Sequence, residues 1–366
     1  MFSNTFKDKK VLITGNTGFK GSWLSAWLIG LEADVYGISK DIPTNPSMFE
    51  VMNLEEKITH FNSDIRDYAS IKKIFQDIKP DFVFHMAAQP IVVTSYKEPI
   101  DTISSNVMGT ANILEALREI NHQCVAIIIT SDKCYDNVEW VWGYKETDVL
   151  GGKDIYSSSK GAAEIIFKSY YHSYFKNTKK YNVRAVSVRA GNVIGGGDWA
   201  DHRIVPDCIK AWVDGKSVEI RSPKATRPWQ HVLEPLSGYL SVAVALSKEI
   251  HLNGESFNFG PHAEYSKTVK DLLYDLSKYW KLDQAPSYNS QEISEFHEAG
   301  LLKLNCDKAL FYLKWLPTLE YDKLIEFTSK WYFNFYNSES NMLEYTLNQI
   351  NEYQKIAVSK GIKWTK

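Results

Sequence analysis

The chain has 366 residues, of which 44% are hydrophobic and 23% are charged, an ordinary balance for one large or two smaller globular α/β domains. Its 42 basic and 44 acidic residues give a net charge of -2, which argues against nucleic-acid or anionic-membrane partners. The amino terminus lacks the apolar core of a signal peptide, and no apolar run reaches the length of a membrane span. We therefore expect a soluble, cytoplasmic protein.

The cysteines predict neither a disulfide framework nor a metal site. They are scattered, with no Cys-x-x-Cys pair and no histidine at zinc-ligand spacing: Cys124, Cys134, Cys208 and Cys306. We expect reduced thiols and no structural metal.

The first predicted strand, residues 10–14, leads into a glycine-rich loop and then an apparent helix over residues 22–31. The loop reads Gly15-Asn16-Thr17-Gly18-Phe19-Lys20-Gly21. Between a strand and a helix, this spacing lets the backbone approach a pyrophosphate, and the helix start supplies free N–H groups. We predict dinucleotide binding here, with an ordinary glycine turn as the alternative.

Three further strands are expected to border the same site. The strand over residues 33–39 ends at Ser39, where a ribose-binding carboxylate is usual, so NAD and NADP both stay open. After the strand over residues 58–62, Asp64-Ile65 is expected to flank the adenine, unless Asp64 is a surface residue. After the strand that begins at residue 81, the small residues of Ala87-Ala88-Gln89 permit close approach of a cofactor.

Strands and helices continue to alternate up to residue 189. A helix over residues 99–120 contains Asn106, which either is an unremarkable helix residue or ties the active-site backbone through a water. Strands are expected over residues 125–129 and 184–189. This pattern predicts a doubly wound parallel α/β sheet of the Rossmann type, with right-handed crossovers.

Candidate acid-base residues follow the strand over residues 125–129. Ser131-Asp132-Lys133 comes at its carboxyl end, the edge of a parallel sheet where ligands bind. Tyr156 and Lys160 are four residues apart, so a helix places them on one face, where the cation is expected to lower the pKa of the phenol. The alternatives to a catalytic role are that Ser131 is only a helix N-cap and that the Tyr-x-x-x-Lys spacing arose by chance.

The character of the chain changes after residue 189. The glycine-rich stretch 190–199 is expected to open a second, mixed α/β lobe. In this lobe, Arg203 and Arg227 suit phosphate recognition, unless they form surface salt bridges. We predict a dinucleotide-binding domain over residues 1–189 and a substrate-binding lobe over residues 190–366. Residues 228–260, approximately, are expected to return to the first domain. Apolar residues at helical spacing over 324–335 predict core contacts.

Taken together, these motifs resemble the extended short-chain dehydrogenase/reductase family and, within it, the nucleotide-sugar 4,6-dehydratases. The resemblance covers residues 8–335, approximately, and rests most firmly on segments 18–24, 131–135, 140–144 and 225–236. Asn16 replaces an expected histidine and Ser158 an expected asparagine, neither at a position with an assigned chemical role.

The resemblance implies a redox-neutral dehydration of CDP-glucose with NAD as cofactor. Tyr156, with Lys160 beside it, would take the proton of the sugar 4-hydroxyl while Ser131 hydrogen-bonds the same oxygen. Asp132 would protonate the departing 6-hydroxyl, and Lys133, as a neutral amine, would remove the C5 proton. The nucleotide would lie near Asn192, Arg203, Pro206 and Arg227, and the sugar near Thr94 and Ser95.

Other members of the family remain alternatives. A dTDP- or GDP-sugar dehydratase would use the same chemistry, whereas a 4-epimerase has no use for an acid-base pair at residues 132 and 133. A non-catalytic dinucleotide sensor is a remote alternative, because both Tyr156 and Lys160 are kept. The resemblance also implies a homodimer or homotetramer that pairs through helices over residues 99–120 and 157–176, and a role in deoxysugar and O-antigen synthesis.

Overall fold

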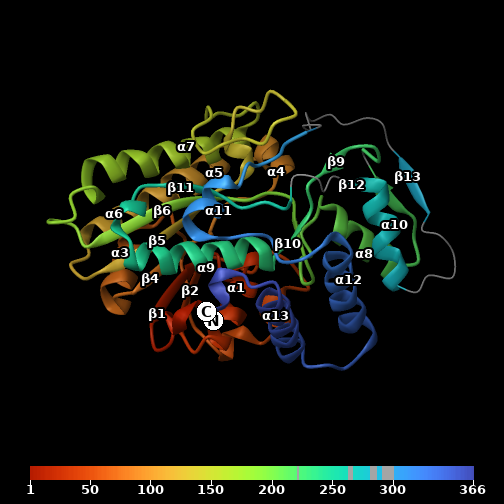
Figure 1. Cartoon of the computed structure of the whole chain (residues 1–366). Coiled ribbons are helices and arrows are strands. Elements are labelled where there is room, and N and C mark those ends of the chain that lie inside the picture. Colours follow the sequence, from red (N-terminus) through yellow and green to blue (C-terminus); the bar gives the residue numbers. More distant parts are fainter. Residues whose placement is uncertain (221, 263–266, 281–286, 291–300) are drawn as a thin grey trace.

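Seven parallel strands form one central sheet in the order β11-β6-β5-β4-β1-β2-β3 (Figure 1). The structure is a computed structural model that describes residues 1–220, 222–262, 267–280, 287–290 and 301–366. The strands are β1 (Lys10–Thr14), β2 (Asp34–Ser39), β3 (Thr59–Asn62), β4 (Phe82–His85), β5 (Cys124–Ile129), β6 (Val183–Arg189) and β11 (Ser256–Asn258). The predicted doubly wound sheet is confirmed.

Helices cover both faces of the sheet because successive strand residues point to opposite sides. In β1, Val11 and Ile13 pack on one face and Leu12 packs on the other. The first face is covered by α1 (Phe19–Gly30) and α9 (Leu233–Lys248), with α13 (Met342–Ser359) packed against α1. The second face is covered by α3 (Tyr68–Ile78), α6 (Gly109–Glu119) and α7 (Ile155–Tyr170).

The helix expected over residues 99–120 is interrupted. The chain forms α5 (Pro99–Ile103), one π-helical turn (Ser104–Met108) and then α6. Asn106 lies in this wide turn, and its side-chain amide hydrogen-bonds the backbone of Gln89 and the hydroxyl of Ser159. Single π-helical turns often occur at functional sites, and here the turn directs an amide towards the end of β4.

A smaller group of elements lies beside the carboxyl ends of the strands (Figure 1). It contains α8 (Ile204–Val213), α10 (Val269–Trp280), α12 (Tyr321–Asn337) and the short strand pairs β8 (Val218–Ile220) with β13 (Tyr288–Ser290) and β9 (Thr226–Arg227) with β12 (Lys267–Thr268). Leu324, Phe327 and Trp331 of α12 are buried, which confirms the predicted core contacts there. The division into domains stays a prediction.

The remaining α-helices and strands are short connections. They are α2 (Met48–Val51), α4 (Val92–Lys97), α11 (Asp307–Leu313) and the parallel pair β7 (Val193–Ile194) with β10 (Gln230–His231). Across the described ranges, no helix combines the length and the apolar character that crossing a bilayer requires.

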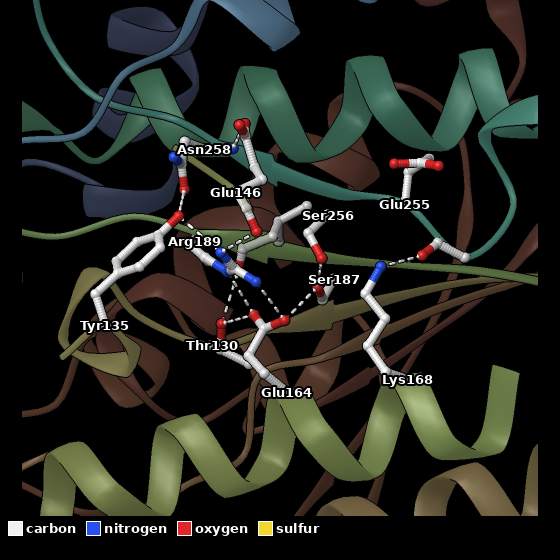
Figure 2. A network of polar contacts seen from close by, with 12 residues as sticks. Thr130, Tyr135, Glu146, Glu164, Lys168, Ser187, Arg189, Glu255, Ser256 and Asn258 are labelled. Atoms are coloured by element: carbon white, nitrogen blue, oxygen red, sulfur yellow. Dashed lines mark hydrogen bonds and ion pairs between the residues drawn. The ribbon is translucent and has the colours of Figure 1, made fainter. Parts of the chain in front are cut away.

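A buried ion pair connects the chain segments at the carboxyl ends of β5 and β6 (Figure 2). The guanidinium of Arg189, at the end of β6, donates to both carboxylate oxygens of Glu164 on α7, over 3.0 and 2.9 Å. Glu164 also accepts from the hydroxyls of Thr130 and Ser187, and Arg189 donates to the Tyr135 hydroxyl over 2.7 Å. Burial raises the pKa of Glu164, but Arg189 and these donors hold it below its usual value.

We expect loss of one partner of this pair to be strongly destabilising. Arg189→Met leaves the Glu164 carboxylate buried without its cation, which costs about 3–5 kcal/mol. Thermal and denaturant unfolding of the variant should report this loss. The control is Arg118→Met, which breaks a more exposed pair with Glu115 and should cost at most about 1 kcal/mol. Equal effects of the two variants would contradict the argument.

A second buried carboxylate joins α9 to the carboxyl-terminal part of the chain. Glu234 accepts from the backbone N–H groups of Thr318 and Leu319 and from the Tyr353 hydroxyl, at 2.7–3.1 Å. Burial raises its pKa from 4.5 to about 7. The folded protein therefore retains a proton that the unfolded chain releases, and the stability from this site is lost as the pH rises through about 7.

Replacing Glu234 with glutamine should remove this dependence on pH. As the pH rises from acid to mildly alkaline values, the free energy of unfolding of the wild type should fall by roughly 3 kcal/mol more than that of the Glu234→Gln variant. Unfolding measured across this range, with the exposed Glu249→Gln as control, checks the prediction. A wild type that gains stability over the Glu234→Gln variant as the pH rises would contradict it.

Candidate active site

Two adjoining cavities open at the carboxyl ends of the central strands. The first, of about 380 Å³, is lined by the glycine loop after β1, by Ala87 and Ala88 after β4, and by Tyr156 and Lys160 of α7. The second, of about 320 Å³, is lined by residues at the edge of the sheet and by residues of the smaller group of elements. Six residues line both cavities: Lys20, Pro90, Ser131, Tyr156, Ala190 and Arg203.

The glycine loop brings the start of α1 close to β1 and β4. Gly15 has φ +78°, and a Cβ there would lie 2.8 Å from the Ala87 nitrogen. A Cβ at Gly21 would lie 2.1 Å from the Gly15 oxygen, so both positions require glycine. Gly18 is the N-cap of α1 and no side chain caps the helix, so its first N–H groups are available to an anion. These features fit the pyrophosphate of a dinucleotide.

Most residues predicted to bind the cofactor line the first cavity. They are Gly15, Thr17, Gly18, Phe19, Lys20, Gly21, Ser39, Asp64, Ile65, Ala87, Ala88, Gln89, Tyr156 and Lys160. The Ser39 hydroxyl donates to the Asn16 side chain over 2.9 Å, and Asp64 forms an ion pair with Arg66. Asn106 lies behind the wall and contacts Gln89 directly, so the predicted bridging water is not needed.

Ser131 and Tyr156 lie together on the wall between the cavities. Ser131 follows the fully buried β5, and its hydroxyl both accepts from the Lys133 backbone and donates to Asp132 over 3.0 Å. Ser131 is therefore the N-cap of the short helical turn that follows it, which was the alternative to a catalytic role, and it also lines both cavities. Tyr156 hydrogen-bonds Ser131 and is 7% exposed.

The acid-base balance of Tyr156 differs from the prediction. Burial raises the pKa of its phenol to about 12, which outweighs the lowering effect of the hydrogen bond with Ser131 and of the charge on Arg203. The Lys160 ammonium lies 6.0 Å from the ring centroid, and burial lowers its own pKa to about 8. In the protein alone, desolvation is therefore stronger than the expected effect of Lys160.

Asp132 and Lys133 lie on the wall of the second cavity. Asp132 is buried, and its carboxylate is packed against Gly191, where a Cβ would lie 1.8 Å from Oδ2. The Asn192 amide also reaches this carboxylate, at 3.5 Å. Lys133 is half-buried. Only a glycine at position 191 leaves space for the Asp132 side chain, so the end of β6 shapes this part of the site.

The residues predicted to bind substrate separate into two groups. Asn192, Arg203, Pro206 and Arg227 line the second cavity, where Arg203 forms an ion pair with Asp198 at 2.7 Å. Thr94 and Ser95 line neither cavity. The buried Ser95 hydroxyl donates instead to the carbonyl of Val92 on the same helix, and Val92 itself lines the second cavity. The predicted sugar contacts are therefore not brought to the site.

Several cavity residues were missed by sequence reasoning. Leu302 and Glu219 come from distant segments, and no local pattern marked them. Glu164 and Arg189 line neither cavity but form the buried ion pair behind the site. They had a visible signal, since Glu164 lies one helical turn after Lys160 and Arg189 ends a buried strand.

Comparisons of the sequence with known proteins agree with this geometry. The profile of the GDP-mannose 4,6 dehydratase family matches residues 12–328. The chain is 44% identical to the CDP-glucose 4,6-dehydratase of Salmonella typhimurium over 352 residues, covering 96% of this chain and 97% of that protein. It is 26% identical to the CDP-paratose 2-epimerase of Salmonella typhi, covering 75% of this chain and 85% of that protein.

Solved structures share the fold. The UDP-glucose 4-epimerase of Thermotoga maritima has a TM-score of 0.75 at 22% identity, covering 89% of this chain and 99% of that chain. The dTDP-glucose 4,6-dehydratase of Bacillus anthracis was solved with NAD. It has a TM-score of 0.73 at 19% identity, covering 90% of this chain and 97% of that chain. These structures show the shared fold, and the sequence comparisons establish that the chain belongs to the GDP-mannose 4,6 dehydratase family of extended short-chain dehydrogenases/reductases.

Proposed function

We propose that this protein is an NAD-dependent CDP-glucose 4,6-dehydratase, which forms CDP-4-keto-6-deoxyglucose for deoxysugar and O-antigen synthesis. The observation that carries the proposal is the common cavity wall of Ser131, Tyr156, Asp132 and Lys133. An epimerase needs only the first two residues, whereas elimination of water needs a second acid and base. The near full-length identity to a CDP-glucose 4,6-dehydratase supports the cytidine nucleotide.

The first cavity suits NAD, with the adenosine end beside Ser39 and Asp64 and the pyrophosphate at the start of α1. Bound there, NAD would supply a positive charge near the phenol and a temporary store for the hydride that is removed from C4 of the sugar and added at C6. The residues between the cavities hold the hexose so that these carbons face the first cavity. The Bacillus anthracis dehydratase of the same fold was solved with NAD.

Oxidation at C4 requires loss of the 4-hydroxyl proton. Tyr156 receives this proton as phenolate, while the Ser131 hydroxyl fixes the position of the same oxygen. The charge of Arg203 favours the phenolate, against the burial that raises the pKa of Tyr156 to about 12. We assign the same role to the Lys160 ammonium, which lies 6.0 Å from the ring centroid. Loss of either charge should therefore slow this step.

Elimination follows because the 4-ketone acidifies the C5 hydrogen. Lys133 as a neutral amine accepts the C5 proton, and Asp132 gives a proton to the 6-hydroxyl, which leaves as water with the electron pair of the C6–O bond. Arg203, Asn192 and Arg227 on the wall of the second cavity suit the diphosphate and nucleotide. Anchoring of these groups keeps the hexose at the acid-base residues during both steps.

The substrate is tested by incubating the protein with CDP-glucose and catalytic NAD or NADP, in parallel with dTDP-glucose and GDP-mannose. We expect a 4-keto-6-deoxy product from CDP-glucose with NAD, without accumulation of reduced cofactor. Product from another nucleotide sugar alone would overturn the substrate, and no product from any would overturn the reaction.

Variants of the two acid-base pairs should fail at different steps. Tyr156→Phe is expected to lose roughly 100-fold or more in the oxidation of C4. Asp132→Asn should oxidise C4 but eliminate water roughly 100-fold more slowly, so that the 4-ketohexose intermediate accumulates. Rapid mixing of each variant with CDP-glucose and NAD, followed by mass spectrometry, distinguishes the steps. Equal defects in oxidation for both variants would contradict the assigned roles.

We also propose that the protein is a homodimer that pairs through α5 and α7, which pack side by side (Figure 1). Large apolar side chains on and next to these helices are exposed, with Ile100 at 76%, Met108 at 55% and Ile165 at 54%. An exposed apolar surface of this kind marks an interaction site. Burial against a second copy would cover it.

Charged substitutions in this surface should separate the subunits. Ile100→Glu combined with Ile165→Glu is expected to sediment as a monomer, whereas the wild type sediments as a dimer. The control is Val358→Glu, an exposed apolar residue on α13. A wild-type monomer, or a double variant that remains dimeric, would overturn the proposed interface.

A further inference from the structure

Lys20 lies where the two cavities meet, although it belongs to the glycine loop. It is the second residue of α1, and it lines both cavities together with Ser131 and Tyr156. Sequence analysis assigned Lys20 to the cofactor. The helix start explains a backbone contact of that kind, but the charge of Lys20 also interacts with Arg203 and Asp132, which line the second cavity.

The Lys20 ammonium lacks a neutralising partner within the described residues, where it forms no ion pair and no hydrogen bond. Arg203, the other cation that lines both cavities, is paired with Asp198. Burial and then the charge of Arg203 lower the pKa of Lys20 to about 8, while Asp132 favours its charged form. Lys160 and Asp198 also act on it, so its charge is coupled to both predicted acid-base groups, Asp132 and Lys160.

We propose that Lys20 is a catalytic residue of the elimination step, with its ammonium facing the hexose between Asp132 and Tyr156. This role rests on the proposed dehydration. Negative charge appears in that step at two places, on the enolate formed from the 4-ketone and on the Asp132 carboxylate after it has given its proton. A buried cation that is already in position stabilises charge that develops in the transition state.

The step balances without any further reactant. Lys133 takes the C5 proton, and the C5–H electron pair forms the enolate with the 4-ketone. Collapse of the enolate restores the 4-ketone and forms the C5–C6 double bond as the C6–O bond breaks. The hydroxyl leaves with the electron pair of that bond and receives the Asp132 proton, forming water. Lys20 keeps its own protons and contributes only its charge, which distinguishes its role from those of Asp132 and Lys133.

The test compares Lys20→Met and Lys20→Arg with the wild type and with Lys7→Met, an exposed lysine paired to Glu32. Single-turnover reactions with CDP-glucose follow C4 oxidation by the near-ultraviolet absorbance of reduced nicotinamide, and product formation by mass spectrometry. NAD affinity is measured by calorimetry. We expect Lys20→Met to retain NAD affinity and C4 oxidation but to form product roughly 100-fold more slowly, with Lys20→Arg intermediate.

Each other outcome overturns a specific claim. Weakened NAD binding by Lys20→Met, with normal product formation at saturating NAD, would return Lys20 to a cofactor role. A defect in Lys20→Arg as large as in Lys20→Met would show that charge alone is not its contribution. A variant that loses thermal stability together with both partial reactions would indicate a structural role. A wild type inactive on every nucleotide sugar would overturn the proposed function as well.

Discussion

The Glu164–Arg189 ion pair is the interaction on which the geometry of the site depends (Figure 2). Glu164 lies one turn beyond Lys160 on α7, and Arg189 directly precedes the loop whose Gly191 accommodates the Asp132 carboxylate. The network extends to Thr130, directly before Ser131, and to Tyr135, directly after the turn that contains Asp132 and Lys133. One buried pair thus positions the segments of all five candidate acid-base residues.

The sequence predicted the parts of this fold that local patterns determine. Apolar runs and the glycine loop indicated the parallel sheet because strands buried on both faces and a close helix start require those residues. The interruption at Asn106 was not predictable, since it depends on contacts with Gln89 and Ser159 from other elements. Leu302 and Glu219 line the second cavity but come from segments distant in the sequence, so their place in the site could not be predicted either.

Side-chain chemistry was predicted less well than position. The Tyr156–Lys160 spacing placed both groups in the cofactor cavity, as expected for one helix face. It gave no information about desolvation, which raises the pKa of Tyr156 and lowers that of Lys160. For Thr94 and Ser95 it was the position that was not predicted. Both match family positions near the sugar, but neither lines either cavity.

In the proposed reaction, one site oxidises C4, eliminates water and reduces C6 of the same hexose. The most direct measurement uses CDP-glucose deuterated at C4 and locates the label in the product by nuclear magnetic resonance. We expect deuterium at C6 of the 4-keto-6-deoxy product, because the hydride removed from C4 is added at C6. Deuterium that returns to C4 would indicate an epimerase, and label lost to solvent would contradict transfer within a single site.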